Sequence, residues 1–87
     1  MWRVELTAGF IKELARLDKP LRLQVANLLE AVSQLDDPRS RGKGLTGELR
    51  SYWRYRIGDY RVIVDIQDDR VCILAITVGH RSRIYRA

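Results

Sequence analysis

The sequence has few of the residues on which several common functions depend. Its single cysteine, Cys72, excludes an internal disulfide and a cysteine-based metal site. His80 is the only histidine, and the carboxylates are scattered through expected helices and turns, so we expect no metal and no other cofactor. No apolar run approaches the roughly 18 residues of a membrane span, and the N-terminus has no signal-peptide pattern. These absences favour a cytoplasmic protein without membrane contact.

Acidic residues are scarce in the second half of the chain. Residues 1–38 hold five bases and six acids, whereas residues 39–87 hold eleven bases and five acids, so the formal net charge of +5 arises in the second half. Ten of those eleven bases are arginine, whose guanidinium binds phosphates with two parallel hydrogen bonds. Nucleic acid or an acidic protein segment is therefore the expected partner.

The 87 residues predict a single domain, 1–87, of the α+β class. Apolar residues alternate with charged ones over residues 2–6, which predicts a strand. Further along the chain apolar residues recur at helical spacing, which predicts two helices. Thr7 is a plausible N-cap for the first helix, and Pro20 suits the first turn of the second. The expected fold is an antiparallel four-stranded sheet in the order strand-helix-helix-strand-strand-strand, with a two-helix hairpin packed on one face. The helices are expected at about 8–18 and 20–35, and the later strands at about 48–57, 60–67 and 70–78.

Gly58-Asp59 separates two runs of aromatic and β-branched residues, which predicts a two-residue hairpin loop. This loop places Arg56 opposite Arg61, with Arg54 near them on the diagonal. Because side chains alternate along a strand, all three arginines share one face, while an apolar set that includes Tyr55 and Val62 forms the core face. The alternation continues into the last strand, with Val71, Ile73 and Ala75 on the core face and with Cys72, Leu74 and Ile76 on the arginine side.

Like charges that face each other across a sheet destabilise it by up to about 1 kcal/mol per pair. Asp65 is the only carboxylate on that face of the hairpin, and it lies away from the arginines. A sheet that keeps such a cluster is expected to bind an external anion with it. The alternative is a solvated edge whose long side chains extend into water.

Two further segments are basic. Residues 39–47, RSRGKGLTG, form either a flexible loop that follows a phosphate backbone or a solvated connector, and they lack the ending of a nucleotide-binding P-loop. In the C-terminal segment Gly79 is expected to end the last strand and to let the chain turn. The residues that follow it combine histidine, arginine and tyrosine beside the arginine-rich face, a layout that suits a polar site.

These features together resemble the RelE/ParE toxin superfamily, and specifically its RelE-like mRNA interferase branch. The resemblance covers nearly the whole chain and is carried by the element order, by DYRVIVDI after WRYRI, and by VGHRSRIY near the C-terminus. The ParE branch, which poisons DNA gyrase, shares the scaffold. The arginine after Val-Gly-His and the tyrosine four residues later are more similar to RelE.

The resemblance implies a ribosome-dependent, metal-independent endoribonuclease that cuts mRNA in the A site by attack of the 2′-OH. It also implies that the protein forms a hetero-oligomer with an acidic, RelB-like antitoxin. The ribosome and mRNA are its other implied partners. RelE-like enzymes often have lysine where this chain has Arg54 and Arg56, so the acid–base assignment does not carry over directly. The catalytic residues implied by the matching motifs are Arg54, Arg56, Arg61, Arg81 and Tyr85.

Arginine is protonated at any cellular pH and is a poor general base. His80 is the only side chain whose ordinary pKa lies near neutrality, so it is a candidate acid or base; otherwise it caps the strand end or contacts rRNA. Two other functions remain open, a ParE-like gyrase poison and a non-catalytic RNA-binding module. The remaining bases expected to contact RNA are Arg39, Arg41, Lys43, Arg50, Arg83 and Arg86.

Overall fold

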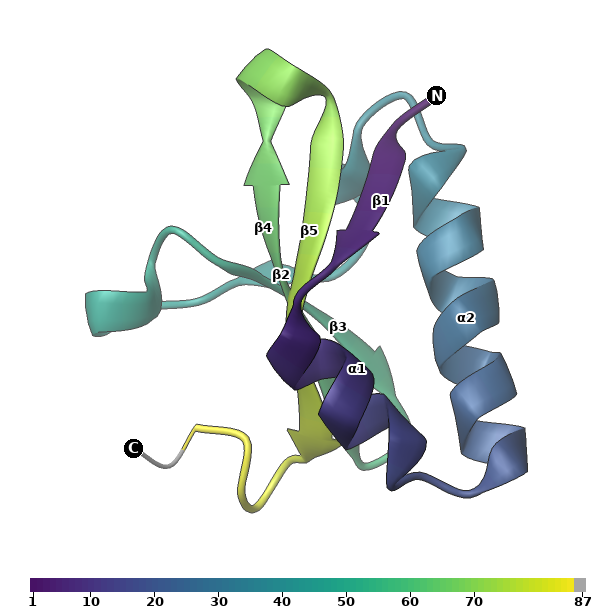
Figure 1. Cartoon of the computed structure of the whole chain (residues 1–87). Helices are drawn as coiled ribbons and strands as arrows, with labels where there is room; N and C mark the ends of the chain where they lie inside the picture. Colours follow the sequence, from purple (N-terminus) through teal and green to yellow (C-terminus); the bar gives the residue numbers. More distant parts are fainter. Residues whose placement is uncertain (86–87) are drawn as a thin grey trace.

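A five-stranded sheet with two helices on one side forms the protein, and the computed structural model describes residues 1–85. The helices are α1 (Ala8–Ala15) and α2 (Lys19–Ser33), and Figure 1 shows α2 standing alongside β1. Three short 3-10 helices, η1 (Pro38–Ser40), η2 (Gly47–Leu49) and η3 (Asp68–Arg70), lie in the connections. The strands are β1 (Arg3–Leu6), β2 (Lys43–Gly44), β3 (Trp53–Ile57), β4 (Tyr60–Gln67) and β5 (Cys72–His80).

The α+β class and the order of the two helices and four of the strands were predicted correctly, but the sheet differs from the prediction. It has five strands in the order β1-β5-β4-β3-β2, and β1 pairs with β5 in parallel, so the sheet is mixed. The extra strand is β2, a two-residue edge strand that pairs with Trp53 and Arg54. It forms within the segment that was expected to be a loop because the Trp53 indole donates to the Arg41 carbonyl oxygen at 2.6 Å and fixes the chain there.

Local side-chain bonds start both helices. The Thr7 hydroxyl accepts a hydrogen bond from the Phe10 amide at the start of α1, as the sequence predicted. At the start of α2 the Asp18 carboxylate accepts from the Leu21 amide, and Pro20 occupies the first turn. α1 ends at Ala15, three residues before the predicted end. No helix among residues 1–85 is long and apolar enough to cross a membrane.

The core lies between the two helices and one face of the sheet. Phe10 from α1 and Val25 and Val32 from α2 are fully buried against strand residues. Tyr55 and Val62, which were predicted for the core face of the hairpin, are also buried here. The predicted packing of a helical hairpin on one face is therefore confirmed.

The β3–β4 hairpin has the predicted register. Ile57 pairs with Tyr60, Arg56 with Arg61, and Arg54 with Ile63. Gly58 has a φ of +54°, and Asp59 is not among the non-glycine residues with positive φ. This combination is typical of a type II′ turn, which requires glycine at its first central position.

β5 departs most from its predicted course. It runs from Cys72 to His80, so Gly79 lies inside the strand and does not end it. Val71 was expected on the core face, but it is 46% exposed in a left-handed conformation with a φ of 48°. The β4–β5 register also shifts: Ile63 pairs with Thr77 and Val64 with Ala75, which leaves Ile76 as an extra, bulged residue.

The bulge reverses the side-chain alternation for the rest of β5. Before it, Ile73 and Ala75 face the core; after it, Val78 does, and Val78 is 1% exposed. Val78 and His80 lie two positions apart on the strand, so their side chains point to the same side of the sheet. His80 therefore lies on the core side, where it pairs with Tyr60 of β4. Gly79 pairs with Arg61 on the other side.

Candidate nucleic-acid interface

The arginine face is the side of the sheet that carries Arg54 and Arg56 from β3 and Arg61 from β4. The hairpin register places Arg56 directly across from Arg61, so the two guanidinium groups leave the same face of adjacent strands. None of the three has a carboxylate oxygen within 4.0 Å in the described part of the chain. The cluster therefore carries positive charge that internal acids do not neutralise.

Arg61 is held by the hairpin itself. Its side chain donates from Nη1 to the carbonyl oxygens of Gly58 and Tyr60, both at 3.0 Å, and the residue is only 7% exposed. These two carbonyl dipoles orient the guanidinium and offset part of the cost of burying its charge. Arg56 opposite is exposed, so the pair presents one fixed and one free guanidinium.

Arg54 connects the arginine face to the C-terminal segment. Its Nη1 donates to the phenol oxygen of Tyr85 at 3.5 Å, which brings two of the predicted catalytic residues together across 31 positions of sequence. The Arg54 Nε–H is buried and has no hydrogen-bond partner among the described residues. A buried donor without a partner costs about 1–3 kcal/mol, a cost that an incoming oxygen acceptor would reduce.

Arg81 follows the end of β5 beside the hairpin loop. Its backbone amide donates to the Asp59 carbonyl oxygen at 2.8 Å, and its Nε lies 3.6 Å from the Asp59 carboxylate. Both side chains are about two-thirds exposed, so this ion pair is weak and open to exchange with another anion. Arg81 lies two positions after Gly79, the partner of Arg61, and thus near the hairpin end of the arginine face.

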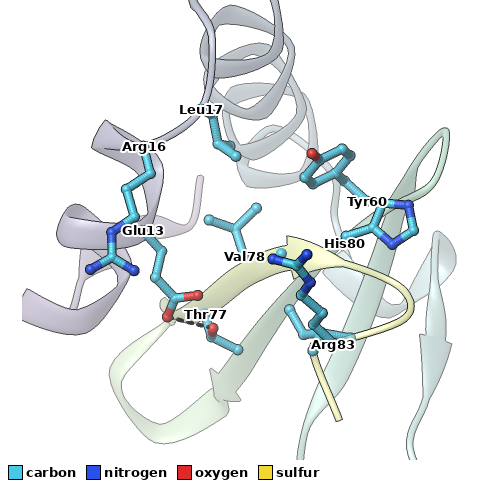
Figure 2. Close-up of a pocket in the computed structure, with 10 residues that line it drawn as sticks. Glu13, Arg16, Leu17, Tyr60, Thr77, Val78, His80 and Arg83 are labelled. Carbon is cyan, nitrogen blue, oxygen red and sulfur yellow. Dashed lines mark hydrogen bonds between the residues drawn. The ribbon is translucent and has the colours of Figure 1, made fainter. Parts of the chain in front are cut away.

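His80 lies apart from the arginine face. Its ring makes an edge contact with Tyr60 at a centroid distance of 5.5 Å. The Ser82 amide donates to Nδ1 at 3.1 Å, so neutral His80 carries its proton on Nε2. Figure 2 shows both rings beside a cavity of about 430 Å³ between α1 and the end of β5, where the Glu13 carboxylate accepts from the Thr77 hydroxyl at 2.8 Å.

The other predicted RNA-contacting bases are spread over several parts of the surface. Arg39 bonds both carboxylate oxygens of Asp68, at 3.0 and 2.8 Å, and this pairing raises the pKa of Arg39 and lowers the pKa of Asp68. Asp68 begins η3 just after β4, seven residues from Arg61, which is roughly 23 Å at strand spacing. Arg50 follows η2, which projects to the left in Figure 1, and Arg83 lines the His80 cavity.

Arg41 and Lys43, by contrast, lie beside the arginine face, where β2 brings them next to Arg54. Arg86 lies outside the described residues. No three His, Cys, Asp or Glu side chains among residues 1–85 are grouped so that they could hold a metal ion.

Sequence reasoning did not find the contribution of α2. Gln24 and Asn27 line a cavity together with Arg41 and Arg56, at the edge of the sheet next to the arginine face. Their helical spacing marks them only as part of the polar side of an amphipathic helix. No signal in the sequence relates that side of α2 to the end of β3.

The fold is that of small toxins of the RelE/ParE superfamily, in agreement with the predicted resemblance. The family described as "ParE toxin of type II toxin-antitoxin system, parDE" matches residues 4–85. The chain belongs to this family. No protein with a curated description matches it in sequence.

Solved structures with the same fold come from bacteria and archaea. The RelBE2 toxin–antitoxin complex of Mycobacterium tuberculosis matches with 26% identity and a TM-score of 0.83, covering 93% of this chain and 92% of that chain. The archaeal RelE–RelB complex of Pyrococcus horikoshii OT3 has 26% identity and a TM-score of 0.73 over 94% and 97% of the two chains. The intact E. coli RelBE complex, at 17% identity and a TM-score of 0.75 over 92% and 96%, is similar in fold.

Proposed function

We propose that this toxin is an mRNA endoribonuclease that acts in the ribosomal A site. The observation that carries the proposal is the cluster of Arg54, Arg56 and Arg61 on one face, without carboxylate partners among residues 1–85 and with the Tyr85 phenol 3.5 Å from Arg54. Such a cluster destabilises the sheet, and a phosphodiester would neutralise it.

RNA carries its own nucleophile, the 2′-OH next to the scissile phosphate. Attack by this oxygen forms a 2′,3′-cyclic phosphate and expels the 5′-oxygen of the next nucleotide. In the proposed mechanism the three arginines bind the non-bridging oxygens, where negative charge increases in the transition state. Groups preorganised in this way contribute roughly 10²–10³ each to the rate.

Arg81 and Tyr85 have separate proposed roles. Arg81 stabilises charge on the leaving 5′-oxygen once the phosphate displaces its weak partner Asp59. Tyr85, which is 43% exposed, stacks on a base or orients the 2′-OH. Both side chains belong to the segment after β5, so the site combines the hairpin and the C-terminal segment.

His80 is the sequence-derived candidate for the general base, but its side chain leaves the sheet on the side opposite to Arg61. We therefore assign no proton transfer to it, and propose that the ribosome positions the 2′-OH so that its proton passes to a water molecule, while water protonates the leaving 5′-oxygen. Replacing His80 with Gln is expected to preserve the cleavage rate and its pH profile. A flattened pH profile in this variant would restore His80 as the base.

We also propose that an acidic, RelB-like antitoxin binds the arginine face and blocks it. The M. tuberculosis, P. horikoshii and E. coli structures are complexes of RelE-like toxins with RelB antitoxins. Carboxylates of a partner would neutralise the same guanidinium groups as the phosphate does. The toxin and antitoxin would then act as a hetero-oligomer in the cytoplasm, where ribosomes and mRNA are found.

A second candidate function is poisoning of DNA gyrase, because the family that matches residues 4–85 is described as ParE. In that case the arginine face would contact gyrase or DNA, and Arg81 and Tyr85 would be dispensable. The arginine–tyrosine contact across the face favours the nuclease.

One experiment separates the two functions and a purely RNA-binding module. The wild type and an Arg81→Ala/Tyr85→Ala double variant are added to a translating extract, and mRNA 5′ ends are mapped. The nuclease predicts new 5′ ends with the wild type and a loss of at least 100-fold in the double variant, given roughly 10²–10³ for each such group. Gyrase-dependent DNA breaks that appear equally with both proteins would favour the gyrase poison, whereas RNA binding without new 5′ ends would indicate a binding module.

A further inference from the structure

A groove runs along the free edge of β3, next to the arginine face. β2 pairs with Trp53 and Arg54, so no strand formed by residues 1–85 covers this edge of β3 from Tyr55 to Ile57. Two cavities of about 370 and 340 Å³ lie along this edge and share Leu28 of α2 with Arg41 and Arg56. Because they share these residues, the cavities form one continuous feature, here called the edge groove.

The strand contributes its backbone to the groove. In a hairpin with a two-residue loop the pairs Ile57–Tyr60 and Tyr55–Val62 exchange the hydrogen bonds between β3 and β4. The N–H and C=O of Arg56 therefore point away from β4, toward the groove. Its wall on β3 offers one unpaired backbone donor and one unpaired acceptor.

The charges that line the groove are all positive. Arg41, Lys43, Arg54 and Arg56 line it, no aspartate or glutamate does, and none of the four forms an ion pair within the described residues. Arg54 and Arg56 also belong to the arginine face. A polyanion bound at the arginine face can therefore extend into the groove and remain next to positively charged side chains along its length.

The wall on α2 carries two exposed amides, Gln24 and Asn27, three positions apart on one side of the helix. A carboxamide presents both a donor and an acceptor and can bond the edge of an unpaired base. The partly exposed Ile57 adds apolar surface on which part of a base can rest, and the buried Leu28 lies beneath the groove. Each cavity falls within the roughly 300–1,000 Å³ that is typical of small-ligand sites.

We propose that the edge groove binds the single-stranded RNA next to the scissile phosphate and that Gln24 and Asn27 select its base. Arg41 and Lys43 contact phosphates, and the two amides hydrogen-bond the base of one flanking nucleotide. The inference rests on the proposed nuclease function and adds the residues that set its sequence preference. An acidic peptide could use the same charges, but the combination of two amides with an apolar surface favours a base, which joins a flat ring to a hydrogen-bonding edge.

The test measures binding of 2′-O-methyl oligonucleotides, which lack the attacking hydroxyl, by fluorescence anisotropy at several salt concentrations. Arg41→Ala is expected to lower the slope of log K against log salt by about 0.7, the value for one phosphate contact to a single strand. Arg16→Ala is the matched control, because Arg16 is exposed just after α1 and lines a separate cavity. It is expected to leave the slope unchanged.

The base-selecting role is tested with a Gln24→Ala/Asn27→Ala variant against oligonucleotides that differ in one base. The wild type is expected to discriminate among them by about fivefold or more, the effect of one good base contact, and the variant is expected to lose this preference while keeping the salt slope. Gln34→Ala, an exposed amide at the C-terminal end of α2, is the control.

Three results would overturn the proposal: no binding of any oligonucleotide by the wild type at low salt, equal salt slopes for Arg41→Ala and Arg16→Ala, or a base preference that survives in the double amide variant. Binding of a glutamate-rich peptide that depends on Arg41, with RNA binding that does not, would assign the groove to a protein partner.

Mapping of 5′ ends in the extract separates the proposed nuclease function from the proposed role of the edge groove. Wild-type RNA binding in the groove without cleavage refutes the nuclease alone, whereas cleavage with an unchanged preference in the amide variant refutes the groove alone.

Discussion

Tyr55 is the largest fully buried side chain, and it joins the sheet to the segment after α2. It is 1% exposed, and its hydroxyl donates to the Pro38 carbonyl oxygen at 2.7 Å. Burial raises the pKa of Tyr55 to about 12, because the phenolate would have to be desolvated. The phenol therefore remains neutral in the folded protein at pH values where it ionises in the unfolded chain.

This pKa predicts a loss of stability in alkali. Because the pKa is raised by folding, its contribution is complete below about pH 10 and is lost as the pH rises toward 12, by about 2–3 kcal/mol in total. Tyr55→Phe is expected to cost about 1 kcal/mol at pH 7, since the Pro38 carbonyl loses its partner, and to reduce the alkaline loss. Urea unfolding of both proteins from pH 8 to 11.5 checks this; parallel pH curves would contradict it.

Val71 adopts a conformation that β-branched residues avoid. Its φ of 48° and ψ of 51° follow η3, where the chain must reverse between β4 and β5. The left-handed region costs a residue with a Cβ about 1–2 kcal/mol, and asparagine tolerates it better than valine does.

Val71→Asn is accordingly expected to stabilise the fold by about 0.5–1 kcal/mol, because the exposed valine contributes little packing. Val4→Asn is the contrasting change, since the partly buried Val4 packs on the core, and it should destabilise. Thermal unfolding of the three proteins measures the effect. A lower melting temperature for Val71→Asn than for the wild type would show that the valine packing outweighs the strain.

At the scale of elements, the chain just before β2 approaches β3 closely at Gly42. A Cβ at this position would lie 2.3 Å from the Arg54 carbonyl oxygen and 2.8 Å from Tyr55 Cδ1, and its φ is +79°. The backbone cannot relieve the contact without moving Arg41 and Lys43 away from β3. Glycine at this position therefore keeps one wall of the edge groove against the sheet.

Gly42→Ala is expected to destabilise the protein by about 2–4 kcal/mol, because steric overlap adds to backbone strain. Gly47→Ala provides the control, since Gly47 also has positive φ, at +66°, but no atom of the described residues lies within 4 Å of its Cβ position. It should cost only the strain, about 1–2 kcal/mol. Equal losses of stability in urea unfolding would mean that the close contact at Gly42 relaxes freely.

The arginine pair across β3 and β4 relates the stability of the sheet to its function. Replacing Arg56 with Thr removes the like charge facing Arg61 and adds a residue that favours strands. We expect an increase of up to about 1 kcal/mol in the free energy of unfolding, together with weaker RNA binding. Arg56→Lys retains the charge and is expected to retain the stability. A threonine variant that is less stable than the wild type would show that the arginines do not repel each other in the sheet.

At the scale of the whole molecule, two exposed ion pairs fasten the β4–β5 turn to distant segments. Arg39 of η1 holds Asp68, and Arg70 of η3 holds Glu5 of β1 at 2.9 Å. The bonded arginines lower the pKa of both carboxyl groups. The charges of Arg39 and Arg70 are thus neutralised at this end of the sheet. The arginine face, whose arginines have no carboxylate partners among residues 1–85, lies toward the β3–β4 hairpin.

The lowered pKa values predict acid sensitivity with a defined sign. A depressed pKa stabilises the folded state above the ordinary pKa of the carboxyl group, and this contribution is lost as the pH falls through the folded-state value. An Arg39→Gln/Arg70→Gln variant should therefore be less stable than the wild type at pH 7, and the difference should shrink toward pH 3. Urea midpoints at both pH values measure it; a constant difference would mean that the pairs contribute through packing rather than charge.

The sequence alone determined the hairpin and its charged face. A glycine turn flanked by β-branched and aromatic runs fixes the register of a two-residue loop, and the alternation of side chains then assigns Arg54, Arg56 and Arg61 to one side. Both helices, the Thr7 cap of the first and the place of Pro20 in the second followed from equally local patterns. Local rules are sufficient here because each relates residues only a few positions apart.

Only the tertiary structure decided the face of His80, the parallel pairing of β1 and the groove beside α2. The bulge at Ile76 changes which side of the sheet every later residue of β5 faces, and no residue in that apolar run marks where the extra residue falls. β1 joins β5 across about 70 positions, and Arg41 reaches β3 through a tryptophan hydrogen bond. These features arise from contacts between distant segments, whose free energies depend on the assembled core and leave no periodic signal in the sequence.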